Sequence, residues 1–164
     1  MVSGKAPMNS PGIRFAVPPL VFTLCFVTAG ALQWFLFSDI KLLPFLPFML
    51  HSAFGLMIGL AGFAFMMAAW FHFLLIGTTV TTSTPVNILV ENGAFHYSRN
   101  PMYVGFVSLL VAGAVGFNSL PFLLAAAFMF VYLSQYIIPR EERYMNAAFP
   151  ESYPSYCRKV RRWL

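Results

Sequence analysis

Residues 91–105 read ENGAFHYSRNPMYVG and form a polar interruption in an otherwise apolar chain. An acid, a histidine, an arginine and an asparagine lie directly before an apolar run that begins at Pro101. Proline suits the first turn of a helix, and Asn100 suits the N-cap position before it. The positive end of this helix then faces Arg99 and His96, which favours either a seat for an anionic group or an ordinary interfacial loop with a snorkelling arginine.

The composition places this stretch at a membrane. The 164 residues are 59% hydrophobic and 9% charged, with a mean hydropathy of +0.74, whereas soluble domains carry about 25% charged residues. We therefore expect an integral membrane protein. The net charge of +5 is carried mostly by the C-terminal tail. This placement favours contact with anionic lipid headgroups over contact with nucleic acid. The three histidines and two cysteines lack metal-ligand spacing, so no metal site is predicted.

Four apolar runs predict an all-α protein with about four transmembrane helices. Residues 15–37 and 50–76 are long enough to cross a hydrocarbon core of about 30 Å. Residues 101–117 reach only the lower limit for a crossing, and a tight uncharged turn separates them from residues 120–138. The last two helices are therefore expected to form a short hairpin whose tip lies deep in the membrane.

The chain divides into three predicted segments. Residues 1–14 form a flexible N-terminal lead, residues 15–76 form two N-terminal transmembrane helices, and residues 77–164 form a loop, a helical hairpin and a tail. Basic residues precede the first helix and follow the last, which predicts a multi-pass protein of the inner (cytoplasmic) membrane with both termini in the cytoplasm.

Small residues line one face of the second apolar run. Gly55, Gly59 and Gly62 recur at the spacing that lets another helix approach closely. This face either packs within the chain or forms a homodimer or a contact with a partner in a membrane complex.

Polar residues also lie in the last apolar run and just after it. Tyr132, Gln135 and Glu142 are spaced three and seven residues apart and would share one helical face, although Pro139 is expected to bend the helix. Each residue alone fits an interfacial or helix-end position. Because the hairpin returns this end to the membrane face that carries Arg99, the acids and the arginine are predicted to converge beside an apolar region.

Three elements together resemble a known family. They are the stretch Gly93–Gly105, the pair Glu141 and Glu142, and a tail with Phe149, Tyr153, Tyr156 and the run 160–163. This order is similar to the isoprenylcysteine carboxyl methyltransferase family and its phospholipid methyltransferase relatives. Asn100 stands where other members carry histidine, and His96 replaces a residue that is commonly arginine.

The resemblance implies a membrane enzyme that binds S-adenosylmethionine in a pocket formed by the last two helices and completed by the cytoplasmic C-terminal tail. The candidate catalytic residues are Arg99, Glu141 and Glu142. The candidate cofactor-binding residues are His96, Tyr97, Arg99, Asn100, Pro101, Tyr103, Gln135, Glu141 and Glu142.

Two functions follow as expectations. The first is an S-adenosylmethionine-dependent methyltransferase that acts on a lipophilic small molecule or lipid with a carboxylate, amine or thiol acceptor. A carboxylate would be positioned by a cation such as Arg99, whereas an amine or a hydroxyl needs a base such as Glu141, Glu142 or His96. The second is a non-catalytic membrane subunit that keeps the fold and serves in the assembly of a complex.

Overall fold

The computed structural model describes residues 17–76 and 89–164, which contain helices and no β-strand. The predicted N-terminal lead, the first two residues of the predicted first helix and residues 77–88 of the predicted loop lie outside the described residues. The long helices are α1 (Val17–Phe35), α2 (Phe48–Ile76), α3 (Pro101–Gly116), α4 (Leu120–Tyr132) and α5 (Ile138–Ala148), followed by the short α6 (Ser152–Lys159). A 3₁₀ helix, η1 (Gly93–His96), precedes α3, and a π-helical turn, η2 (Leu133–Ile137), joins α4 to α5.

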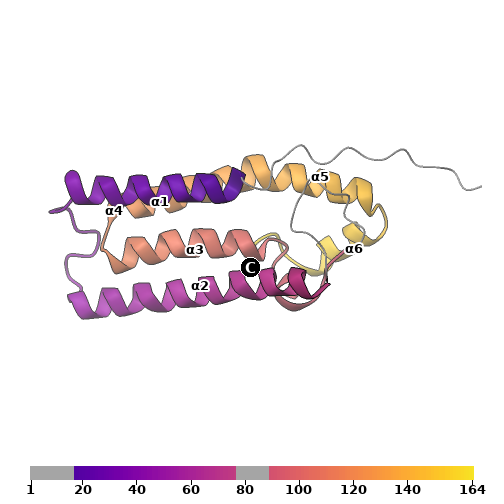
Figure 1. Ribbon diagram of the computed structural model, residues 1–164, viewed down its shortest axis with the longest axis horizontal. Helices are drawn as coiled ribbons and strands as arrows, with labels where there is room; N and C mark the ends of the chain where they lie inside the picture. The colour runs from indigo at the N-terminus through magenta and orange to yellow at the C-terminus, as the bar shows by residue number, and fades with distance from the viewer. Residues whose placement is uncertain (1–16, 77–88) are drawn as a thin grey trace, which may run out of the picture.

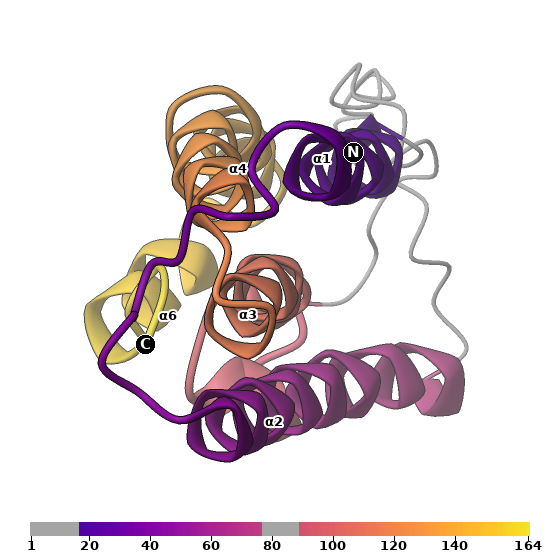
Figure 2. The same cartoon turned by 90° about the vertical axis from the view of Figure 1, so that its left-hand side faces the viewer.

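The helices form an elongated bundle with one extended end. α3 lies between α2 and α4, and α1 lies along α4 (Figure 2). α5 and α6 extend beyond the other helices at the end where α3 begins (Figure 1). The bundle core contains fully buried Leu110, Met129 and Leu133 and also includes Ala29 of α1, so helices from both predicted membrane segments share it.

This chain is an all-α integral membrane protein. In the part of the chain that the structure describes, three helices are long and apolar enough to cross a membrane: Val17–Phe35, Phe48–Leu75 and Leu120–Ala148. Large apolar side chains on their outer faces are exposed, for example Trp34 at 79% and Leu75 at 85%, as expected for surfaces in contact with lipid. α3 is apolar but has only 16 residues, so a fourth crossing stays a prediction.

The second arm of the hairpin is longer than the sequence predicts. α4, η2 and α5 follow one another without a break from Leu120 to Ala148, so only α3 is short. In a regular α-helix the ring of Pro139 would clash with the carbonyl group of Gln135 and leave it without a donor. The wider π turn directly before Pro139, in which the Ile138 amide bonds to the Leu133 carbonyl, lets the helix continue.

Asn118 and Ser119, in the turn between α3 and α4, are buried. Asn118 has a positive φ of 54°, and its side-chain amide donates to the Leu43 carbonyl at 3.1 Å. Nδ1 of the buried His51 lies 3.1 Å from the Gly116 carbonyl oxygen, so this nitrogen carries the proton and donates. The loop between α1 and α2 therefore covers the tip of the hairpin.

The small-residue face of α2 packs within the chain. A Cβ atom on Gly55 would lie 2.8 Å from the Ala112 carbonyl oxygen, and one on Gly105 of α3 would lie 3.1 Å from the Gly62 carbonyl oxygen. The glycines thus let α2 and α3 approach each other closely. The alternative use of this face as a homodimer or complex interface finds no support, because α3 occupies it.

We expect Gly55→Ala to destabilise the bundle, because its new methyl group meets the backbone of Gly116 and Ala112. Overpacking of this kind costs about 1–3 kcal/mol. Gly59→Ala is the matched control, since its methyl group meets only the side chain of Ala112 at 3.3 Å. Thermal melts in detergent should show a lower midpoint for Gly55→Ala alone; equal midpoints would contradict the tight backbone contact.

Candidate functional site

The segment before α3 packs against α2 and contains a buried serine. Gly93 begins η1 with a φ of 65°, and Phe95 packs against Ala69 of α2. Ser98 is fully buried, and its hydroxyl oxygen accepts from the Asn100 amide at 3.1 Å. These contacts fix the direction in which the chain enters α3.

The C-terminal tail lies across the start of α3. The Arg99 amide donates to the Arg161 carbonyl at 3.0 Å, and the Asn100 side-chain amide donates to the Arg162 carbonyl at 2.9 Å. Asn100 takes the N-cap position, but its side chain makes no capping hydrogen bond, because it holds the tail instead. Trp163 packs on Phe130 of α4, with 4.8 Å between the ring centroids.

A carboxylate from α5 joins these two segments. Glu142 forms ion pairs with Arg99 at 3.0 Å and with Arg162 at 2.6 Å, and its second contact with Arg162 is a 3.1 Å hydrogen bond from Nε. The side chains of Arg99 and Glu142 are only 15% and 17% exposed, and that of Arg162 is 39% exposed. The hydrogen bonds that Arg162 donates to the Glu142 carboxylate raise the pKa of Arg162. Partly buried charge-assisted bonds of this geometry are strong.

The neighbouring acid has a different partner. The Tyr103 hydroxyl of α3 donates to Oε1 of Glu141 at 2.7 Å. The two acids of α5 therefore both face the start of α3, one toward a phenol and the other toward two guanidinium groups.

α6 completes the surroundings of Arg99. Nη1 of Arg99 lies 2.7 Å from Sγ of Cys157, and the buried Tyr156 hydroxyl donates to the Phe95 carbonyl at 2.6 Å. Burial raises the pKa of Tyr156, so its phenol stays protonated at neutral pH and keeps this donor. Nε of Arg99 is buried and has no hydrogen-bond partner, which leaves a donor available to an anionic group.

The structure brings together six of the predicted site residues and leaves three apart. Arg99, Asn100, Pro101, Tyr103, Glu141 and Glu142 gather at the junction of α3, α5 and the tail. His96 and Tyr97 are exposed and contact each other with a ring-centroid separation of 5.4 Å. Gln135 is also exposed. Within the described residues, none of these three makes a hydrogen bond or ion pair with the cluster, and their roles stay predictions.

Arg162 and Cys157 are site residues that sequence reasoning passed over. Both lie in the basic tail. Charge placement alone gives Arg162 the same role as the other basic residues there, which is to orient the protein in the membrane. The signal was present, since the run 160–163 belongs to the pattern that carries the family resemblance. Contact between the tail and α5 could not be read from spacing along the chain.

A family of known proteins matches more than half of the chain. The family model described as phospholipid methyltransferase matches residues 50–152, which include most of α2, the whole of α3 and both acids. An uncharacterized protein of Haemophilus influenzae is 39% identical to this chain over 64 residues, which are 38% of this chain and the whole of that protein. No solved structure matches the chain.

We expect Glu142→Gln to loosen the tail, because the neutral amide replaces a carboxylate that holds two cations. Hydrogen bonds to charged groups contribute about 1.5–3 kcal/mol each, so amide hydrogen exchange in residues 152–164 should accelerate roughly tenfold or more. Glu151→Gln changes the same charge at an exposed position and is the matched control. Unchanged exchange in Glu142→Gln would show that the ion pairs do not hold the tail.

Proposed function

Because this chain belongs to the phospholipid methyltransferase family, we propose that it is an integral membrane methyltransferase that uses S-adenosylmethionine and acts on a lipophilic or amphipathic acceptor. The observation that carries the proposal is the convergence of Arg99, Glu141 and Glu142 at one end of an apolar helical bundle. Arg99 lies 42 or more positions from the two acids in the sequence, so the fold brings them together.

The chemistry of the cluster fits such a cofactor. S-adenosylmethionine carries a sulfonium, an ammonium and a carboxylate group. The Glu142 carboxylate is suited to its cationic groups, Glu141 adds a second acidic side chain, and the unpartnered Nε of Arg99 is suited to a carboxylate. When bound, the cofactor would supply an electrophilic methyl group.

The residues of the chain then position the acceptor and exclude water. A carboxylate acceptor can be held by Arg99, whereas an amine or thiol acceptor needs to lose a proton, for which Glu141 or Glu142 can serve as the base. Methyl transfer to an anion neutralises opposite charges, so it gains from a site with little water. The side chains of Arg99 and Glu142 are only 15% and 17% exposed, so little water reaches this part of the cluster.

The acceptor is proposed to be amphipathic because the described residues offer large apolar surfaces and one polar end. The exposed residues of α1 and α2 are mostly Leu, Phe and Met. A lipophilic acceptor can therefore approach from the bilayer, while the polar cofactor arrives from water. The alternative, a non-catalytic subunit that assembles through the Gly55–Gly62 face, is not favoured, because α3 already covers that face.

The polar end is proposed to face the cytoplasm. Arg140, Arg143, Arg158, Lys159 and Arg161 are exposed on α5, α6 and the tail, and an excess of basic residues marks cytoplasmic segments. We expect a cysteine at exposed position 159 (Lys159→Cys) to react with a membrane-impermeant maleimide only after the cells are permeabilised. Labelling in intact cells would place the site on the outer side.

We expect Glu142→Gln to weaken the binding of S-adenosylhomocysteine much more than Lys159→Gln does. Removing a charged partner from a partly buried site costs about 2–5 kcal/mol, or roughly 30-fold or more in affinity. Arg99→Ala should abolish turnover while the helical bundle stays folded. Calorimetric titration measures the affinities.

Thermal melts control for unfolding in these variants, and Glu141→Gln tests the second acid. Unchanged affinity in both Glu141→Gln and Glu142→Gln would overturn the assignment of the acids to the cofactor. Absence of any S-adenosylhomocysteine binding by the folded wild-type protein would sink the methyltransferase proposal itself.

A further inference from the structure

The Glu142 carboxylate already has two cationic partners. Its Oε1 accepts from Nη1 of Arg99 at 3.0 Å and from Nε of Arg162 at 3.1 Å, and its Oε2 accepts from Nη2 of Arg162 at 2.6 Å. A carboxylate offers about four acceptor positions, and one negative charge here faces two positive charges. A third cation at this carboxylate would therefore meet net repulsion, so it has to replace one of the two arginines.

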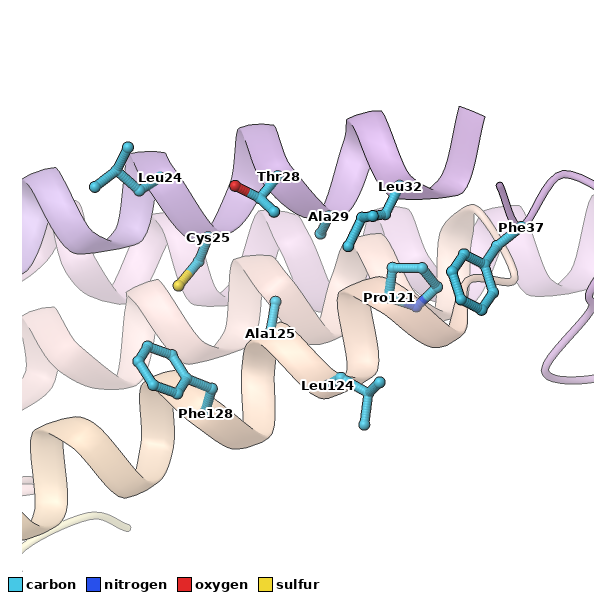
Figure 3. A pocket seen from close by; sticks show the side chains of 10 residues that line it. All are labelled: Leu24, Cys25, Thr28, Ala29, Leu32, Phe37, Pro121, Leu124, Ala125 and Phe128. Atoms are coloured by element: carbon cyan, nitrogen blue, oxygen red, sulfur yellow. The ribbon is translucent and has the colours of Figure 1, made fainter. Parts of the chain in front are cut away.

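Other parts of the described structure offer a cation less. The groove between α1 and α4 is lined by ten residues that are apolar apart from Thr28 and Cys25, and none of the ten is charged (Figure 3). Glu141 accepts from the Tyr103 hydroxyl at 2.7 Å. Among the described residues, Glu142 is the acid that forms ion pairs. Exchange of one cation for another is therefore expected at Glu142.

Arg162 is the partner that leaves at the lower cost. Its side chain is 39% exposed, whereas that of Arg99 is 15% exposed. Nη1 of Arg99 also lies 2.7 Å from Sγ of Cys157. A charge that moves into water regains its hydration, while a charge left unpaired in a buried position keeps its full desolvation cost. The geometry therefore favours exchange of Arg162 and retention of Arg99.

Other contacts keep the tail near Glu142 when the Arg162 side chain moves. The Arg162 carbonyl accepts from the Asn100 side-chain amide at 2.9 Å. Trp163 packs on Phe130 of α4, with 4.8 Å between the ring centroids. The guanidinium group of Arg162 thus stays within reach of the carboxylate and can pair with it again.

We propose that Arg162 is an exchangeable partner of Glu142, whose guanidinium group leaves the carboxylate when a ligand's primary ammonium group pairs there and returns when that ligand leaves. Arg162 thereby competes with the ligand. Between binding events it keeps the carboxylate fully paired, which avoids an uncompensated charge in a partly buried position. The identity of the ligand as S-adenosylmethionine or its product rests on the proposed function.

The reaction of Arg162 with phenylglyoxal measures this pairing without any cofactor. The reagent attacks the neutral guanidine, and the hydrogen bonds donated to Glu142 raise the pKa of Arg162, so pairing slows the reaction. Mass spectrometry gives the labelling of Arg162 relative to the exposed Arg161 in the same sample. Glu142→Gln should raise this ratio roughly fivefold or more, whereas Glu151→Gln, at an exposed position, should leave it unchanged.

Two simple cations test the exchange itself in the wild-type protein. Methylammonium chloride should raise the Arg162 to Arg161 labelling ratio, because its N–H groups can donate to the Glu142 carboxylate. Tetramethylammonium chloride at the same concentration has the same charge and no N–H group, so it controls for screening by salt. S-Adenosylhomocysteine, which carries a primary ammonium group, should raise the ratio at far lower concentration.

Calorimetric titration tests the competition from the side of the ligand. Arg162→Gln should bind S-adenosylhomocysteine about fivefold more tightly than the wild-type protein, because it removes the competing cation. Arg161→Gln makes the same change of charge at the neighbouring exposed position and should shift the affinity less than twofold. The affinity for 5′-methylthioadenosine, which has no ammonium group, should be the same in all three proteins. Thermal melts control for folding.

Three results would overturn the proposal. The first is S-adenosylhomocysteine binding to the wild-type protein with an unchanged labelling ratio. The second is weaker binding to folded Arg162→Gln, which would make Arg162 a part of the binding site. The third is an equal gain for 5′-methylthioadenosine, which would indicate a general opening of the tail. A protein that responds to methylammonium but binds no S-adenosylhomocysteine would keep the exchange and refute only the methyltransferase proposal.

Discussion

The Glu142 carboxylate holds together three segments that would otherwise separate. It accepts from Arg99 at the entrance to α3 and from Arg162 in the tail. With the carboxylate absent, two guanidinium groups would share one partly buried region without a counter-charge, and such an arrangement is costly. The Arg99 amide and the Asn100 side chain donate to carbonyl groups of the tail, and these hydrogen bonds require the tail to stay at the start of α3. The ion-pair network therefore both holds the three segments together and supplies charged side chains of the site.

Two packing constraints bring Glu142 to that position. Close contact between α2 and α3 at Gly55 and Gly62 keeps α3 inside the bundle. The first turn of α3 therefore lies against α5. The π turn then carries the helix past Pro139 without a break. A helix that stopped before this proline would leave the acids on a loop, whereas a continuous helix fixes their direction. Backbone geometry far from the acids thus decides which groups they meet.

The sequence predicted the helical membrane class, the polar junction at Arg99 and the convergence of both acids on it. Hydropathy and proline positions carry that information locally. It did not reveal that Gln135 is separated from the acids, because the π turn changes the number of residues per turn between them. Nor did it single out Arg162, because charge placement alone assigns every basic residue of the tail the same orienting role.

The α4–α5 helix joins two different environments. Along Phe128 and Tyr132 its contacts are aromatic and apolar, whereas toward its C-terminal end Glu141 and Glu142 each lie against a defined donor. Because the π turn lets one helix continue through both regions, the position of the acids is fixed relative to the apolar bundle. The same helix therefore crosses the apolar region and positions the polar cluster.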